Sequence, residues 1–214
     1  MAMGQSSAGK IVNNSCDRRT LFLFRHGETD WNREGRLQGH IDTPLNAIGL
    51  AQAEALADRL LAHRLDVILS SDLSRALTTG RIVADTLGVP LTIDLGLRET
   101  NVGAAEGMIW ADAKARFGEE LTERWYSDTD VAFPGGETGQ ATLTRGLAAL
   151  RRFVIAHPYR RIGVSTHGAM VRQLVKHSLP PGSTPVRAPN TALFVLQYEP
   201  AADRLIPIAE DEPS

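Results

Sequence analysis

Hydrophobic residues recur along the chain in two patterns. Short apolar runs, of which Leu21 to Phe24 is the first, predict buried strands, and longer stretches with apolar residues three and four apart predict amphipathic helices. The predicted strands cover 21–25, 66–69, 91–98, 161–165, 191–198 and 204–208. The predicted helices cover 47–63, 73–87, 109–117, 121–126, 138–156 and 168–177.

The order of these elements predicts an α/β fold. Strands alternate with helices from the first strand onward, which is typical of a parallel sheet covered by helices. We expect a three-layer α/β/α sandwich with a mostly parallel central sheet and one antiparallel strand. A chain of 214 residues is long enough for one sizeable core. The predicted organisation is a flexible tail over 1–19, a single domain over 20–209 and a short tail over 210–214.

Composition and charge exclude several kinds of partner. The formal net charge is −2, so the chain lacks the strong positive charge that binding to nucleic acid or to an anionic membrane requires. The first 19 residues contain no apolar core of a secretory signal, and no stretch approaches the roughly 20 apolar residues of a membrane span. The single cysteine, Cys16, cannot form an intramolecular disulfide. We therefore expect a cytoplasmic protein with no nucleic-acid or membrane partner.

Charged and imidazole side chains follow several of the predicted strands. Arg25 and His26 follow the first strand, His167 follows the strand at 161–165, and Arg75 and Glu99 lie in other segments that follow strands. Because the carboxyl ends of parallel strands lie along one edge of a sheet, these groups are expected to converge on one crevice. A neutral imidazole can act as a nucleophile, and guanidinium groups stabilise a phosphoryl group in transfer. The set predicts phosphoryl transfer through a covalent intermediate.

The same residues argue against a metal site. Nearby arginines would repel a cation, and the chain has no His-x-x-His or His-x-x-x-His spacing. The sequence therefore predicts chemistry without a metal ion.

Five short motifs, in this order along residues 20–198, resemble those of the histidine phosphatases, the superfamily that includes the phosphoglycerate mutases. A bare Arg-His-Gly would be weak evidence, but the ordered set is specific. The motifs are Arg25-His26-Gly27-Glu28-Thr29, Ser71-Asp72-Leu73-Ser74-Arg75-Ala76, Leu97-Arg98-Glu99, Gly135-Gly136-Glu137-Thr138 and Thr166-His167-Gly168.

The resemblance implies a phosphoglycerate mutase-like catalytic domain and a role for each matching residue. It makes His26 the nucleophile that becomes phosphohistidine, and it makes Arg25, Arg75 and His167 the groups that bind the phosphate. Glu99 would give a proton to the leaving oxygen and, in a hydrolase, would then take one from the attacking water.

The resemblance also implies further binding residues and leaves competing acids. The matching positions that would line the phosphate or substrate pocket are Asn32, Gln38, Gly39 and Gly168. The acids that compete with Glu99 for the proton-transfer role are Glu28, Glu106 and Glu137. The aromatic residues expected to pack in the core or in a lid are Trp110, Trp125, Tyr126 and Phe133.

Two features favour a phosphatase over a mutase. Only 35 residues separate Glu99 from Gly135, where the mutases carry a longer insertion, and the segment 37–39 is more like that of the phosphatases. We therefore predict a metal-independent phosphomonoesterase that needs no cofactor, acts on a small phosphorylated metabolite and releases inorganic phosphate. One alternative is a phosphoglycerate mutase that requires 2,3-bisphosphoglycerate, and another is an inactive relative that binds a phosphorylated ligand. Neither the substrate nor the oligomeric state can be predicted from these patterns.

Overall fold

The computed structural model describes residues 18–127, 130–184 and 186–208. Cys16, almost all of the predicted tail 1–19 and the predicted tail 210–214 lie outside the described residues. The first strand, β1 (Arg19–Arg25), begins at the last residue of the predicted N-terminal tail. Within the described ranges, no helix combines the length and the hydrophobicity needed to cross a membrane.

Six strands form one sheet in the order β3-β2-β4-β1-β5-β6. The strands β2, β3 and β4 all run parallel to β1, whereas β5 pairs with β1 in the antiparallel direction and β6 is antiparallel to β5. The predicted α/β fold with a mostly parallel sheet and one antiparallel strand, β5, is confirmed. The bounds of the other strands are Val67–Ser70 (β2), Leu91–Ile93 (β3), Arg161–Thr166 (β4), Leu193–Glu199 (β5) and Arg204–Pro207 (β6).

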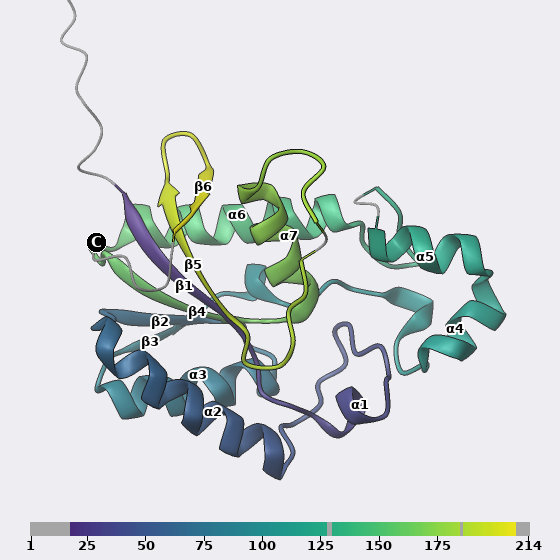
Figure 1. Ribbon diagram of the computed structural model, residues 1–214, viewed down its shortest axis with the longest axis horizontal. Coiled ribbons are helices and arrows are strands. Elements are labelled where there is room, and N and C mark those ends of the chain that lie inside the picture. Colours follow the sequence, from purple (N-terminus) through teal and green to yellow (C-terminus); the bar gives the residue numbers. More distant parts are fainter. Residues whose placement is uncertain (1–17, 128–129, 185, 209–214) are drawn as a thin grey trace, which may run out of the picture.

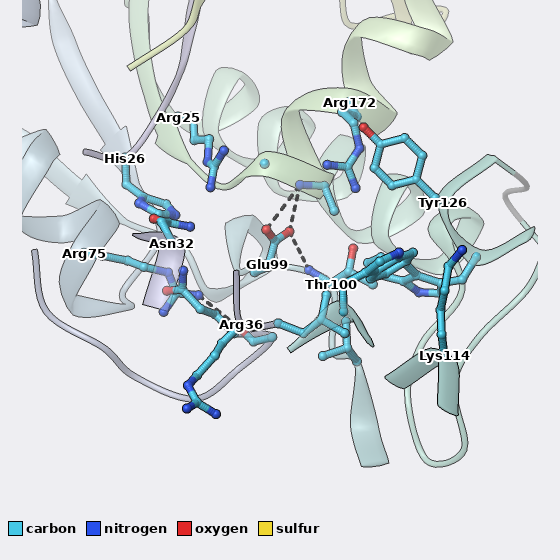
Figure 2. Close-up of a pocket in the computed structure, with 18 of the residues that line it drawn as sticks. Arg25, His26, Asn32, Arg36, Arg75, Glu99, Thr100, Lys114, Tyr126 and Arg172 are labelled. Carbon is cyan, nitrogen blue, oxygen red and sulfur yellow. Dashed lines mark hydrogen bonds between the residues drawn. The ribbon is translucent and has the colours of Figure 1, made fainter. Parts of the chain in front are cut away.

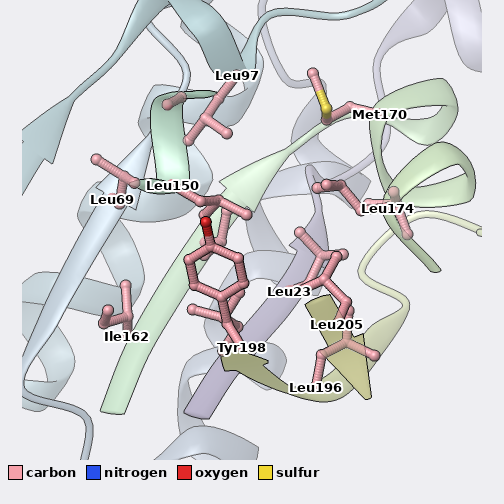
Figure 3. Packing of buried hydrophobic residues seen from close by; sticks show 14 of the residues in the cluster. Leu23, Leu69, Leu97, Leu150, Ile162, Met170, Leu174, Leu196, Tyr198 and Leu205 are labelled. Carbon is pink, nitrogen blue, oxygen red and sulfur yellow. The ribbon is translucent and has the colours of Figure 1, made fainter. Parts of the chain in front are cut away.

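Helices cover both faces of the sheet and give the predicted three layers (Figure 1). Side chains of β1 alternate between the faces, as a period of two requires. Leu21 and Leu23 belong to the larger core cluster with residues of α6 and α7, shown in Figure 3, while Phe22 and Phe24 belong to a cluster with residues of α2 and α3. These four helices span Ala47–Leu60 (α2), Ser74–Leu87 (α3), Gly139–Ala156 (α6) and Gly168–Ser178 (α7).

The remaining helical segments lie between these elements. The two helices α4 (Trp110–Phe117) and α5 (Glu119–Ser127) stand to one side of the sheet over a separate apolar cluster that includes Val102 and Phe133 (Figure 1). The short segments are α1 (Asp30–Arg33), η2 (Leu61–His63), η3 (Leu95–Leu97) and η4 (Gly103–Ala105).

The prediction of a strand over 91–98 is wrong beyond Ile93. The Asp94 side chain accepts a hydrogen bond from the Gly96 amide at 2.7 Å, and this local bond turns the chain into the 3₁₀ segment η3. The strand β5 starts at Leu193, two residues later than predicted, because Thr191 has a φ of 55° and lies in a turn. The helix α1 was not predicted; Thr29 and Asn32 form a capping box at its start.

The register of β1 and β4 places the two motif histidines together. These strands are parallel neighbours, and Arg25 pairs with Thr166. His26 and His167 are the next residues along each strand, and the His26 amide donates a hydrogen bond to the Thr166 carbonyl at 3.0 Å. The sheet therefore brings residues that are far apart in the sequence to one point of its carboxyl edge.

Candidate active site

A pocket of about 500 Å³ opens at the carboxyl edge of the sheet (Figure 2). It is lined by eight of the nine residues predicted for the site, and the ninth, His167, lies next to His26 with the two ring centroids 5.3 Å apart. The structure thus brings the whole predicted set together. The eight that line the pocket are Arg25, His26, Asn32, Gln38, Gly39, Arg75, Glu99 and Gly168.

The imidazole of His26 is buried and fixed in one tautomer. Its Nδ1 atom lies 2.6 Å from the carbonyl oxygen of Gly27. A carbonyl oxygen only accepts hydrogen bonds, so Nδ1 carries the proton and Nε2 keeps its lone pair. A free lone pair on Nε2 is what a nucleophile at this position requires.

Gly27 allows the loop after β1 to reach this position. A Cβ atom on Gly27 would lie only 2.3 Å from the carbonyl oxygen of Gly49, in the first turn of α2. The loop and the helix are therefore in direct backbone contact, which only glycine permits. This close approach explains the glycine of the Arg-His-Gly motif.

The two arginines are held by backbone carbonyls through their outer nitrogens. Arg25 Nη1 donates to Ala188 at 2.8 Å, and Arg75 donates to Ile41 and to Gly39, each at 2.9 Å. The Nε atom of each arginine is buried without a hydrogen-bond partner among the described residues. Buried N–H groups left without a partner cost free energy, so a bound anion would relieve both.

One ring nitrogen of His167 has a hydrogen-bond partner and the other has none. Its Nε2 atom lies 2.8 Å from the hydroxyl of Ser71, and its Nδ1 atom is buried without a hydrogen-bond partner in the part of the chain that the structure describes. Arg25, Arg75 and His167, which lie near His26, therefore each carry one buried polar atom without a partner among the described residues. This arrangement fits a small anion such as phosphate.

Burial and charge keep both imidazoles neutral. Burial, followed by the positive charges of Arg25 and Arg75, holds the pKa of His26 well below its usual value. The pKa of His167 is lowered by burial first and then by Arg75. Burial also lowers the pKa of Arg25 to about 10, so this guanidinium remains charged at neutral pH. A neutral nucleophile next to cationic groups is suited to attack on an anionic ester.

The carboxylate of Glu99 lies on the other side of the pocket, at the start of α7. One of its oxygens accepts hydrogen bonds from the amides of Thr100 at 2.9 Å and Ala169 at 3.0 Å, and the other accepts from Ala169 at 3.2 Å (Figure 2). The amides at a helix N-terminus attract negative charge. Glu99 is therefore fixed by the same helix that follows His167.

The competing acids do not line the pocket. Each is engaged elsewhere: Glu28 accepts from the Asn46 amide group at 2.9 Å, Glu106 from the His40 backbone amide at 2.6 Å, and Glu137 from the Asn101 amide at 2.8 Å. Glu99 and Glu123 are the carboxylates that line the pocket, and Glu123 is exposed and pairs with Lys114. Glu99 is thus the acid closest to the predicted chemistry.

Comparison with known proteins agrees with this geometry. A sequence profile described as the histidine phosphatase superfamily (branch 1) matches residues 21–209. The chain belongs to the histidine phosphatase superfamily. The resemblance carried by the five motifs is therefore confirmed, and the named activities of the relatives include more than one type of phosphoryl transfer.

Three relatives of this chain illustrate the range. A metal-independent phosphoserine phosphatase of Arabidopsis thaliana is 37% identical over 157 residues, which are 72% of this chain and 66% of the plant protein. The chain thus spans just under two thirds of that relative. A 2,3-bisphosphoglycerate-dependent phosphoglycerate mutase of Methylobacterium sp. is 35% identical, over 73% of this chain and 79% of the mutase. The structure of a mycobacterial glucosyl-3-phosphoglycerate phosphatase superposes with a TM-score of 0.77 at 29% identity, covering 85% of this chain and 91% of that one.

An arginine of α6 pairs with Glu137, the acid of the Gly-Gly-Glu motif. Arg145 donates to the backbone carbonyls of Gly96 at 2.9 Å, Arg98 at 2.6 Å and Glu99 at 2.7 Å, and it also pairs with Glu137. The group of Arg145, Glu137 and the loop 96–101 is called the Arg145 clamp below. The clamp fixes the backbone that carries Glu99.

Several pocket residues were not assigned a role from sequence. They form the outer pocket, between the phosphate position and solvent. Trp110 and Trp125, whose ring centroids are 6.1 Å apart, line it as well as packing together, whereas Phe133 is buried in the cluster below. One of these residues, Arg172, could have been predicted from the sequence, because it lies four positions after Gly168 and therefore on the same face of the helix. The outer pocket consists of Arg36, Leu37, Thr100, Val102, Trp110, Lys114, Glu123, Trp125, Tyr126, Ala169 and Arg172.

The lowered pKa values predict how stability depends on pH. Below pH ~6.5 the unfolded chain takes up protons on His26 and His167, but the folded protein does not. We therefore expect the free energy of unfolding to decrease as the pH falls below that value, by at most about 1.4 kcal/mol per pH unit for each histidine. At higher pH, both histidines are neutral in the folded and the unfolded protein, so they do not make the free energy of unfolding depend on pH.

Urea unfolding over this pH range, in the absence of phosphate, measures the effect. The control is the His26→Asn variant, whose slope should be smaller by about one proton. An unchanged slope in this variant would show that His26 takes up a proton in the folded protein.

Proposed function

We propose that this chain is a metal-independent phosphomonoesterase that acts on small phosphorylated metabolites through a phosphohistidine on His26. The observation that carries the proposal is the His26 imidazole, neutral and with Nε2 unprotonated, next to the buried guanidinium groups of Arg25 and Arg75. The named activities of the relatives support it, since they include hydrolysis of phosphomonoesters.

In the first step, the Nε2 lone pair of His26 attacks the phosphorus atom. A P–N bond forms, and the P–O bond to the alcohol breaks. Arg25, Arg75 and His167 hold the charge on the three remaining phosphoryl oxygens. The carboxyl group of Glu99 gives its proton to the departing oxygen, so the product leaves as a neutral alcohol.

In the second step, water attacks the phosphohistidine from the side that the alcohol has left. The Glu99 carboxylate takes a proton from this water, an O–P bond forms and the P–N bond breaks. His26 returns to its neutral form and inorganic phosphate leaves. Glu99 is again protonated, ready for the next substrate.

A phosphoglycerate mutase is the second candidate, because relatives with this activity align over most of the chain. It would use the same first step but return the phosphoryl group to a sugar acid, and it would require 2,3-bisphosphoglycerate. The short segment between Glu99 and Gly135 favours the phosphatase. An inactive relative is disfavoured by the presence of all five chemical groups.

The test is a hydrolysis assay on the purified full chain. We expect release of phosphate from p-nitrophenyl phosphate and from members of a panel of phosphorylated metabolites, with rates unchanged by a chelator. The panel identifies the substrate by its value of kcat/KM. Phosphoglycerate mutase activity that strictly requires 2,3-bisphosphoglycerate, with negligible phosphate release, would overturn the proposal in favour of the mutase.

A further inference from the structure

We infer that Ser71 is a positioning residue, whose hydroxyl donates a hydrogen bond to Nε2 of His167 and so keeps the ring proton on Nδ1, where it can bind the phosphoryl group. The inference rests on the proposed function, in which His167 holds the phosphate. It adds the ring atom that binds and the residue that determines where the proton lies. The sequence motifs assigned no role to Ser71.

The ends of three neighbouring strands bring Ser71, His167 and His26 together. The strands β2, β4 and β1 are adjacent and parallel, with β4 in the middle. Ser70, at the end of β2, pairs with Ser165 of β4, and the Ser71 amide donates to the Ser165 carbonyl at 3.0 Å. The sheet register therefore places Ser71 beside the segment that carries His167, and the strand on the other side of β4 carries His26.

The side chains of Ser71 and His167 are both buried, so each of their polar groups needs a partner within the protein or on a ligand. The Ser71 oxygen accepts from the Leu73 amide at 3.3 Å and lies 2.8 Å from Nε2 of His167. Among the described residues, Nε2 is the sole acceptor within hydrogen-bond distance of the Ser71 hydroxyl, and Nδ1 of His167 has no partner. These contacts determine which ring nitrogen carries the proton.

The number of groups left without a partner distinguishes the two tautomers of His167. The ring is neutral at pH 7, because burial holds its pKa well below the ordinary value. With the proton on Nε2, the ring would donate to Ser71, and both the Ser71 hydroxyl proton and the Nδ1 lone pair would lack a partner. With the proton on Nδ1, the hydroxyl donates to Nε2, and only the Nδ1 N–H lacks a partner. Because each unsatisfied buried group costs free energy, the second tautomer is the more stable.

The N–H that remains on His167 is suited to an anion. Phosphoryl oxygens accept hydrogen bonds, whereas a lone pair on Nδ1 would repel them. His26, with its ring centroid 5.3 Å away, is the same tautomer with the opposite end engaged: its Nδ1–H lies against the Gly27 carbonyl and its Nε2 lone pair is free. A carbonyl partner thus makes one imidazole a nucleophile, and a hydroxyl partner makes its neighbour a hydrogen-bond donor.

Nitrogen NMR of the isotope-labelled wild-type protein, without phosphate and at neutral pH, tests the tautomer directly. Long-range proton–nitrogen spectra distinguish a protonated from an unprotonated ring nitrogen, and the signals that disappear in His167→Asn assign the ring. We expect His167 to have a protonated Nδ1 and an unprotonated Nε2. A protonated Nε2 would overturn the inference, whatever the activity of the protein.

The variant Ser71→Ala removes the hydroxyl that fixes the tautomer. The His167 signals should change to those of a ring with a protonated Nε2 or of a mixture, while the His26 signals keep their pattern. We expect kcat for p-nitrophenyl phosphate to fall about 10- to 100-fold, and the inhibition constant of vanadate, which mimics the phosphoryl group in transfer, to rise by a similar factor. Ser71→Thr keeps the hydroxyl and should recover most of both losses.

The matched control is Ser165→Ala, which removes another buried serine hydroxyl. That hydroxyl donates to the Ala76 carbonyl at 2.7 Å and not to an imidazole. The control should lose stability, because a buried carbonyl loses its donor, but it should keep the His167 tautomer and a kcat within about threefold of the wild-type value.

The outcomes separate the inference from the proposed function. Unchanged kcat and unchanged vanadate inhibition in Ser71→Ala overturn the inference and leave the phosphatase intact. Equal losses in Ser71→Ala and Ser165→Ala also overturn it, because they would show a general effect on the fold. Failure of the wild-type protein to hydrolyse any phosphomonoester overturns the proposed function, and the spectrum still reports the tautomer. If Ser71→Ala does not fold, the wild-type spectrum decides.

Discussion

Replacing His26 with alanine is expected to reduce the steady-state rate of phosphate release by about four to six orders of magnitude. Loss of a nucleophile in a covalent mechanism has effects of this size, because the remaining groups can only bind and polarise the ester. The described residues that line the pocket offer no other imidazole or thiol, and the buried hydroxyl of Thr100 is paired with that of Thr142 at 2.9 Å. Phosphate release from p-nitrophenyl phosphate measures the effect.

The covalent step has its own signature. After brief mixing with labelled substrate and quenching in base, the wild-type protein should retain a label that is stable in base and lost in acid, and His26→Ala should retain none. The matched control is His157→Gln, which changes a histidine at the end of α6, outside the pocket, and should preserve both activity and label. Activity of His26→Ala above about one hundredth of the wild-type rate would exclude His26 as the nucleophile.

Replacing Glu99 with glutamine is expected to produce a loss that depends on the leaving group. An alkoxide leaves poorly unless it is protonated, so kcat for an alkyl phosphate should decrease by about 10²- to 10⁴-fold. Nitrophenolate leaves without a proton, so the first step on p-nitrophenyl phosphate should be nearly unchanged. The second step should still be slow, because glutamine cannot take a proton from water.

Rapid-mixing kinetics distinguish these steps. Glu99→Gln should release one equivalent of nitrophenol per active site in a burst, followed by slow turnover, while alkyl phosphates should show no burst. Glu54→Gln, on the exposed side of α2, is the control and should behave as wild type. If the burst rate and the alkyl-phosphate rate fall equally, Glu99 acts by holding the substrate rather than by moving protons.

The sheet and the phosphate position were predictable from the sequence because both depend on local signals. An apolar run followed directly by polar residues defines a strand end, and parallel strands align their ends at one edge. His26 and His167 satisfy this rule, and the register of β1 with β4 places them side by side. The motifs around Arg75 and Glu99 supplied the other groups.

The outer pocket was not predictable, since it depends on how separate elements pack. Lys114 and Trp125 reach the pocket only because α4 and α5 stand beside the sheet over the cluster around Phe133. Arg145 binds the backbone carbonyls of the loop 96–101, which face one point only because the chain turns at η3. The sequence predicted a continuing strand there. The Asp94 side chain decides that turn, and its effect is too local for hydrophobic periodicity to reveal.

The Arg145 clamp has a consequence for how this protein can change over evolutionary time. The Glu137 amide donates to the Asn101 carbonyl at 2.9 Å, and the Glu137 carboxylate accepts from the Asn101 amide. The segment 102–136 therefore starts and ends at two residues that are hydrogen-bonded to each other. Insertions or deletions within the segment 102–136 need not move the carboxylate of Glu99. Changes in the length of this segment can therefore alter which alcohol part of a substrate is preferred, while the groups that carry out phosphoryl transfer stay the same.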